Sequence, residues 1–335
     1  MGNCIGDAKK SAAEIAPSEM IKKSPNKPLI KLYGPPNTFA TSHIRMALLY
    51  KPVTLRFVPS ELHQTPTLMY QSDVVSGSVE EILSYLDSKF PDPPLAGAGS
   101  TSSTSSSIWG WCGEATPVVV SVVLLQHRSM IWHLERMLKW ADDLAARGGK
   151  LRGDPSMGSP RMEVKKFGKS YSQLLQVMLE HAQMEETVLF QILEAADRGV
   201  CKTANEEHAR HLPIMNGIKE EIKTIGVMNP GSPEYQEAFA NLSSRLKRLK
   251  DNCRQHFEEE ERDLLPLLEA TELNKPQQER VLQQSLDAMR ETHSNLFRFF
   301  MEGLSPHDAM QYLDLIKRYC DNARASLMLH MIVGG

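Results

Sequence analysis

The chain has 335 residues, which is enough for two or three domains with a sizeable core. Its composition of 41% hydrophobic and 24% charged residues is ordinary for globular proteins, and its formal net charge of -3 argues against a nucleic-acid-binding protein. The five cysteines are scattered along the chain and odd in number, which argues against a disulfide framework and indicates a reducing compartment.

Residues 1–27 are expected to be a tail that attaches to a membrane. The chain begins Met-Gly-Asn-Cys, so that Gly2 can accept a myristoyl group and Cys4 a palmitoyl group. Two acyl chains anchor a protein stably, whereas one binds only marginally. Position six is Gly6 where the usual motif has Ser or Thr, so a disordered tail without acylation is the alternative. We expect the protein on the cytosolic face of a membrane, with the plasma membrane favoured.

No stretch of the sequence predicts a membrane-spanning helix or a secretory signal. The longest apolar run, 118–125, is too short to cross a bilayer, and no hydrophobic signal region follows Met1.

Residues 28–91 alternate between strand and helix patterns and predict an α/β module. Strands are expected over 29–33, 53–58 and 66–70, and helices over 41–50 and 78–90. Ser78 can cap the second helix, and Glu81 three residues later completes a capping box.

This module resembles the thioredoxin-like N-terminal half of glutathione transferases. The resemblance rests on four segments: Leu32-Tyr33-Gly34, residues 45–51, Thr65-Pro66-Thr67-Leu68 and residues 78–86. It implies that Pro66 is a cis-proline lining a glutathione site and that Ser78 holds the γ-glutamyl carboxylate.

The match departs from the family at the residues that matter for catalysis. This chain has Gly77-Ser78 where the family usually has Glu-Ser, and the activating hydroxyl or thiol has no clear equivalent beyond Thr38, Thr41 and Ser42. A scaffold without catalysis is therefore favoured over a glutathione-dependent enzyme.

Residues 92–117 are expected to link the module to the next domain. Residues 92–107 are rich in Pro, Gly, Ala, Ser and Thr, and such a composition cannot bury enough apolar surface to fold.

From residue 118 onward the sequence predicts helices. They are expected over 118–146, 162–197, 204–225, 234–270, 277–301 and 306–331. The first four would form an up-down four-helix bundle over 118–270, with Pro266 kinking the last of them. The other two would form a C-terminal extension over 271–335.

A motif occurs twice in the predicted bundle. Both copies read His-x-x-x-Glu-Glu, followed by Leu and then Leu-Glu-Ala at the same offsets, with His181 and Glu185 in one and His256 and Glu260 in the other. Residues four apart share a helix face, so each copy presents an imidazole beside a carboxylate. Two such helices that face a shared core can build a metal site.

Each of the four bundle helices carries at least one histidine. His127 is on the first, His181 on the second, His208 and His211 on the third, and His256 on the fourth. Imidazole with carboxylate suits iron, manganese or zinc. Two bridging carboxylates between nitrogen-rich ends favour two metal ions, and iron is the natural occupant.

The order of these residues resembles that of the hemerythrin-like HHE cation-binding domains. Their pattern is a lone His on helix one, His-x-x-x-Glu on helix two, Glu-His on helix three and His-x-x-x-Glu-Glu on helix four. The resemblance covers 118–270 and implies six ligands: His127, His181, Glu185, His208, His256 and Glu260. Classical oxygen carriers have two histidines four apart on helix three and an Asp on helix four. Here His208 and His211 are three apart and Glu260 replaces Asp, which points to the sensory or iron-handling members.

The other histidines and the methionines have simpler interpretations. A lone histidine on an apolar helix face is more often a core residue with its hydrogen bonds satisfied than a metal ligand. A His-x-x-x-Glu pair is more often a contact at the solvent-exposed surface of a helix. The repeat of the motif on two helices argues against both alternatives. His133 is about 240° around the helix from His127 and is excluded. His211 is a spare ligand, and Glu261 is a candidate partner for a ligand. The methionines suggest core packing.

The expected function is binding of iron, with a diiron centre favoured and zinc or manganese open, coupled to sensing of iron, oxygen or redox state at a membrane surface. The partners would be a metal ion, oxygen or a small redox ligand, and the membrane. Two alternatives are a glutathione-transferase-like enzyme and a metal-free helical interaction scaffold.

Overall fold

The computed structural model describes residues 27–60, 64–95, 116–149, 159–320, 324–326 and 328–329. Gly2, Cys4 and most of the expected linker lie outside these ranges. None of the helices within them has both the length and the apolar character that a membrane span requires.

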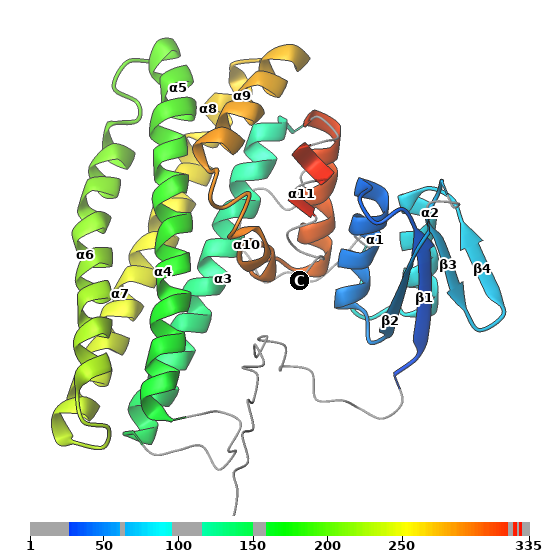
Figure 1. The fold of residues 1–335 in the computed structure, drawn as a ribbon. Helices are drawn as coiled ribbons and strands as arrows, with labels where there is room; N and C mark the ends of the chain where they lie inside the picture. Colours follow the sequence, from blue (N-terminus) through cyan, green and yellow to red (C-terminus); the bar gives the residue numbers. More distant parts are fainter. Residues whose placement is uncertain are drawn as a thin grey trace, which may run out of the picture.

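The N-terminal module is a four-stranded sheet with two helices (Figure 1). Its elements are β1 (Leu29–Gly34), α1 (Phe39–Tyr50), β2 (Thr54–Pro59), β3 (Thr67–Tyr70), β4 (Asp73–Ser76) and α2 (Val79–Lys89). The strand order is β2-β1-β3-β4; β1 runs parallel to β2, and β3 runs antiparallel to β1 and to β4. This mixed sheet is compatible with the predicted thioredoxin-like module.

Strand β4 was not predicted. It is a short edge strand that pairs with β3 through a two-residue turn, in which Gln71 has a φ of 53°. The turn residues are Gln and Ser rather than the Asn-Gly or Asp-Gly that mark such hairpins in a sequence. Beyond α2 the chain remains packed on the module as far as Leu95, which is buried and whose N–H donates to Asp87.

The helical bundle begins at residue 118, as predicted. Its elements are α3 (Val118–Arg147), α4 (Pro160–Met184), the π-helical turn η2 (Glu185–Leu189), α5 (Phe190–Ala196), α6 (Lys202–Val227), α7 (Pro233–Asp263) and α8 (Leu265–Ala270). The long helices lie side by side, with α3 against α4 and α7, and α6 against the same two helices (Figure 1). Apolar residues at helical spacing fill the middle, among them Phe167, Phe239 and Leu246, all at 0% exposure.

Two of the predicted helices are interrupted. The helix expected over 162–197 contains the π-helical turn η2, and the helix expected over 234–270 breaks at Leu264. The second break follows from Pro266, which lacks the N–H donor that the helix interior requires. The predicted kink at Pro266 is therefore confirmed as a break.

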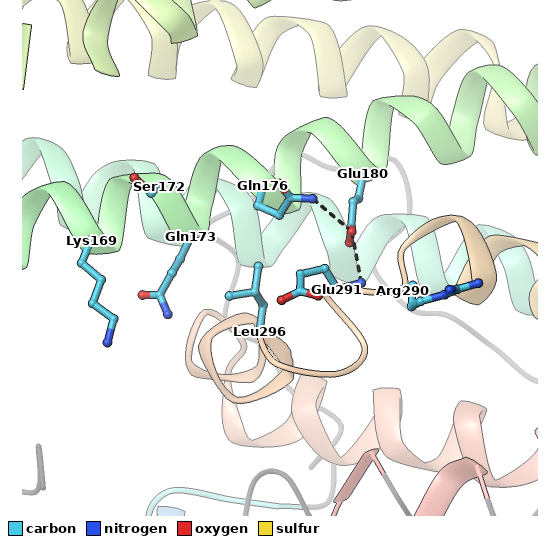
Figure 2. A pocket seen from close by; sticks show the side chains of 8 residues that line it. All are labelled: Lys169, Ser172, Gln173, Gln176, Glu180, Arg290, Glu291 and Leu296. Carbon is cyan, nitrogen blue, oxygen red and sulfur yellow. Dashed lines mark hydrogen bonds between the residues drawn. The ribbon is translucent and has the colours of Figure 1, made fainter. Parts of the chain in front are cut away.

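The C-terminal extension contains α9 (Lys275–Ala288), α10 (Phe297–Glu302) and α11 (Pro306–Tyr319) among the described residues. The two long helices predicted here are wrong in extent, since 277–301 divides in two and α11 ends at Tyr319, although residues 324–326 and 328–329 are helical again. Helix α9 stops because the following backbone finds another partner. The Glu180 carboxylate of α4 accepts hydrogen bonds from the N–H groups of Glu291 and Thr292. Figure 2 shows Glu180 between Gln176 and Glu291.

The extension lies between the bundle and the N-terminal module (Figure 1). On the bundle side, the Ser129 hydroxyl donates to the Phe300 carbonyl at 2.7 Å. On the module side, the Tyr50 hydroxyl donates to the Met301 carbonyl at 3.2 Å, and α1 packs against α11. Two consecutive residues of α10 therefore hold the parts together: Phe300 binds the bundle, and Met301 binds the module.

Candidate metal centre

Six side chains from α3, α4, η2, α6 and α7 meet in the core of the bundle. They form two groups, each of two histidines and two glutamates, and the potential ligand atoms of each group lie within 4.8 Å of one another. The two groups share both glutamates and together contain His127, His181, Glu185, His208, His256 and Glu260. The structure thus brings together all six residues that the sequence singled out.

Each shared carboxylate turns its two oxygens toward different histidines. Glu185 places Oε1 3.2 Å from His181 Nε2 and Oε2 3.4 Å from His208 Nε2. Glu260 places Oε2 3.6 Å from His127 Nε2 and Oε1 3.5 Å from His256 Nε2. This is the arrangement of two carboxylates lying between two pairs of nitrogen donors.

Every one of the four imidazoles has an acceptor at its other ring nitrogen. The Nδ1 partners are Glu261 at 3.0 Å for His127, Gln126 at 3.0 Å for His181, Glu186 at 2.9 Å for His208 and Glu207 at 2.7 Å for His256. An oxygen acceptor at Nδ1 selects the tautomer with its proton there. The Nε2 lone pairs then point into the cluster, which is how proteins present histidine to a metal.

The cluster without a cation leaves polar atoms unsatisfied. Glu185 Oε2, both carboxylate oxygens of Glu260 and His256 Nε2 are buried without a hydrogen-bond partner. His127 Nε2 and His181 Nε2 face each other at 3.1 Å, although both rings have their proton at Nδ1. Buried polar groups without partners are costly, and one cation in each of the two groups would satisfy these atoms. The residues present therefore fit a bound metal.

The two glutamates are electrostatically opposed. Burial would raise the pKa of Glu185, but the imidazoles of His181, His127 and His208 hold it well below its usual value. Burial raises the pKa of Glu260 well above its usual value, and the negative charges of Glu185, Glu207 and Glu261 add to this. Two such carboxylates resist ionising together unless positive charge lies between them.

The comparison with protein families agrees with this geometry. Residues 118–268 match the model of the hemerythrin HHE cation-binding domain. This segment is a hemerythrin-type domain. The match contains all six clustered residues, and it ends two residues before the predicted boundary at 270. Neither the curated proteins nor the solved structures that were compared contain a match to the chain.

The hemerythrin-type domain widens its second helix at the cluster itself. The π-helical turn begins at Glu185, whose carbonyl accepts from the N–H of Phe190, five residues later. Such wide turns occur mostly at functional sites. Nothing in the sequence pattern signalled it, because the spacing His-x-x-x-Glu is that of an ordinary α-helix.

The other histidines that the structure describes lie outside the cluster. His133 binds the Phe299 carbonyl through Nε2 at 2.7 Å, which agrees with its exclusion. His293 is buried in the extension beside Tyr312. His211, the spare ligand, is in neither group, and its ring centroid lies 5.4 Å from that of His256. His330 lies outside the described residues.

A cavity of about 530 Å³ in the hemerythrin-type domain reaches the cluster. Besides His181, His208 and His256, its lining is mainly apolar and includes Met130, Met178, Met215, Cys253 and Phe257. The predicted core role of the methionines holds, since these three are buried. His211 also lines this cavity and places a polar side chain in it.

The second hollow is a shallow groove on the outer face of α4 (Figure 2). Its rim includes Lys169, Gln173 and Arg290. The Glu180 carboxylate, which also lines it, is engaged by the backbone of the extension. Glu180 therefore has a structural role at this groove.

The expected cis bond at Pro66 is wrong. Among the described residues, the cis peptide bond precedes Pro93, and the Thr65–Pro66 bond is trans. X-Pro bonds differ little in energy between the two isomers, so the surrounding fold decides. Ser78 caps α2, where its hydroxyl accepts from the Glu81 N–H at 3.2 Å and completes the predicted capping box. Its role toward glutathione stays a prediction.

Proposed function

We propose that the protein binds non-haem iron as a dinuclear centre and uses it to sense or handle iron, oxygen or redox state. The observation that carries this proposal is the pair of carboxylates, each with one oxygen toward either end of the cluster. His127 and His181 would hold one ion, His208 and His256 the other, and Glu185 and Glu260 would bridge them. Bound iron would supply one-electron redox chemistry and affinity for small ligands.

The donor set favours iron over zinc. Structural zinc sites are closed tetrahedra, commonly with thiolates, whereas this cluster offers four imidazoles and two carboxylates. Among the described residues, neither group contains a cysteine. Carboxylate and imidazole from facing helices are the donors of carboxylate-bridged iron centres in bundles.

The surrounding side chains orient the ligands and limit access of water. Glu261, Gln126, Glu186 and Glu207 fix the imidazole rings by accepting from their Nδ1 atoms. Phe257 stacks on the His127 ring at a centroid distance of 4.1 Å. The ligand rings are thereby oriented, and the cluster is largely buried.

The adjoining cavity supports a sensing role. It reaches His181, His208 and His256 and has a mainly apolar lining, so a small uncharged molecule such as dioxygen can approach the centre. We infer that access to the ions is through this cavity.

The test is the metal content of the full-length protein after purification. We expect about two irons per chain in the wild type and none in a folded His181→Ala/His256→Ala double variant. His133→Gln is the matched control, because His133 is buried on the same helix as His127 but outside the cluster. Wild-type protein that is folded without metal would refute the proposal and favour a metal-free scaffold.

We further propose that the tail holds this centre at a membrane surface. The support is the Met-Gly-Asn-Cys start, which offers Gly2 and Cys4 as two acylation sites. Incorporation of labelled myristate should be lost in Gly2→Ala, and incorporation of labelled palmitate should be lost in Cys4→Ser. A wild-type chain that takes up neither label would refute this anchor.

A further inference from the structure

A path of polar side chains leads from the metal centre into the C-terminal extension. His181 Nδ1 lies 3.0 Å from Gln126 Oε1, and the Gln126 amide faces the hydroxyl of Tyr312 on α11. The Tyr312 hydroxyl lies 2.6 Å from His293 Nε2. The contact between Gln126 and Tyr312 is loose, because the Gln126 nitrogen has no partner in ordinary hydrogen-bond geometry. Tyr312 and His293 both lie outside the hemerythrin-type domain.

The direction of the tyrosine hydrogen bond follows from the far side of His293. Its Nδ1 lies 2.8 Å from the Met289 carbonyl oxygen, which can only accept. The proton of the neutral ring is therefore on Nδ1, and Nε2 has a lone pair. Tyr312 consequently donates its O–H to Nε2, so that a phenol and a ready proton acceptor form a short hydrogen bond.

The pair is sealed from water by aromatic rings. Tyr312 is 0% and His293 is 4% exposed, and the Phe300 ring centroid lies 4.9 Å from that of Tyr312. Burial raises the pKa of Tyr312, so the phenol stays protonated. Burial lowers the pKa of His293 to about 4, so the imidazole stays neutral. A radical formed on Tyr312 would be shielded from solvent.

We propose that Tyr312 is a redox-active tyrosine that gives one electron to the metal centre while its proton moves to His293. In this step the Oη–H bond breaks and a proton bonds to His293 Nε2, leaving a neutral phenoxyl radical beside an imidazolium. The oxidant is the iron centre after its reaction with dioxygen or hydrogen peroxide, and it is reduced by one electron. The inference rests on the proposed function, because it needs iron in the cluster.

Tyr171, a buried tyrosine with a structural role, has a different hydrogen-bond partner from Tyr312. The buried Tyr171 donates to the Met215 carbonyl at 2.9 Å, an acceptor that cannot take a proton. Tyr171 therefore provides a matched control. It is a buried tyrosine of the hemerythrin-type domain, and its hydroxyl binds a backbone carbonyl.

The test is electron paramagnetic resonance of the full-length protein. Protein loaded with iron(II) without oxygen is exposed to oxygen or hydrogen peroxide, frozen and examined, and its iron content is measured in parallel. We expect a tyrosyl radical whose spectrum changes when the protein contains ring-deuterated tyrosine. The radical yield should fall at least about tenfold in Tyr312→Phe. It should be unchanged in Tyr171→Phe.

His293→Gln separates hydrogen bonding from proton transfer. Glutamine can accept the Tyr312 hydrogen bond but cannot take its proton, so the radical should be lost although iron still binds. Iron in the wild type without a radical, or a radical that persists in Tyr312→Phe, would overturn this inference alone. A folded wild type without iron would overturn both this inference and the proposed function.

Discussion

His127 Nε2 and His181 Nε2 face each other at 3.1 Å in the core of the bundle, and each ring has an oxygen acceptor at its Nδ1. Two neutral imidazoles in this tautomer present two lone pairs to each other. The contact is repulsive unless a cation or an additional proton lies between them. The fold thus holds two nitrogen donors in a position that only a bound positive charge makes favourable.

Metal removal should therefore destabilise the bundle. A metal that binds the folded state alone adds RT ln(1 + [L]/Kd) to its stability, or about 2.7 kcal/mol at a hundredfold excess over Kd. We expect the midpoint of thermal unfolding to fall when a chelator is added to wild-type protein. It should not change in the His181→Ala/His256→Ala variant. Equal midpoints with and without chelator in metal-loaded wild type would contradict this.

Glu207 should set the metal affinity without being a ligand itself. Its Oε2 lies 2.7 Å from His256 Nδ1 and fixes that ring. Loss of such a partner typically costs ten- to a hundredfold in metal affinity. Glu207→Ala, which removes the acceptor, should therefore weaken iron binding about tenfold or more, measured by competition with a chelator. The control is Glu206→Ala, since Glu206 is exposed and its carboxylate lies 4.0 Å from Lys202 Nζ. Similar affinity in both variants would sink the idea.

The six candidate ligands could be predicted because helix geometry fixes their spacing locally. His181 with Glu185, and His256 with Glu260, are four residues apart, and this spacing alone places each pair on one face. His127 and His208 followed from the order of histidines over four helices. The α/β module was likewise predictable, because strands β1, β2 and β3 have clear apolar patterns.

The partners of the ligands could not be predicted, because they depend on how helices rotate against one another. Gln126 is adjacent to His127 in sequence but binds His181 of the next helix. Glu180 is adjacent to His181 but binds the backbone of the extension. The π-helical turn at Glu185 and the end of α9 likewise result from tertiary contacts that override local propensity.

Glu180 should be the anchor of the extension. It accepts hydrogen bonds from the Glu291 and Thr292 N–H groups and from the Thr292 hydroxyl at 2.7 Å. Glu180→Ala leaves these buried donors without an acceptor and should cost about 2–4 kcal/mol of unfolding free energy. Denaturant unfolding would measure it, and limited proteolysis should cut more readily between α9 and α10. Gln173→Ala, on the same helix and groove, should behave as wild type; equal loss in both variants would exclude this role.

Acid should destabilise the protein through His133. Burial, with a contribution from Arg136, lowers the pKa of His133 to about 3, whereas an unfolded histidine has about 6.5. Between these values the unfolded chain binds a proton that the folded chain does not. The contribution of His133 to stability is therefore complete above about pH 6.5 and is lost as the pH falls toward 3.

The variant His133→Gln isolates this effect. Between about pH 6.5 and pH 5, a range of about 1.5 pH units, His133 is protonated in the unfolded chain but not in the folded chain. This difference lowers the unfolding free energy by about 2 kcal/mol. Between pH 7 and pH 5, the unfolding free energy of metal-free wild type should fall by about 2 kcal/mol more than that of metal-free His133→Gln. The variant is also less stable at pH 7, because the packing of His133 against Phe299 is lost. The histidines of the metal centre titrate equally in both proteins and cancel in the difference. Parallel pH profiles of the two proteins would show that His133 is protonated in the folded state.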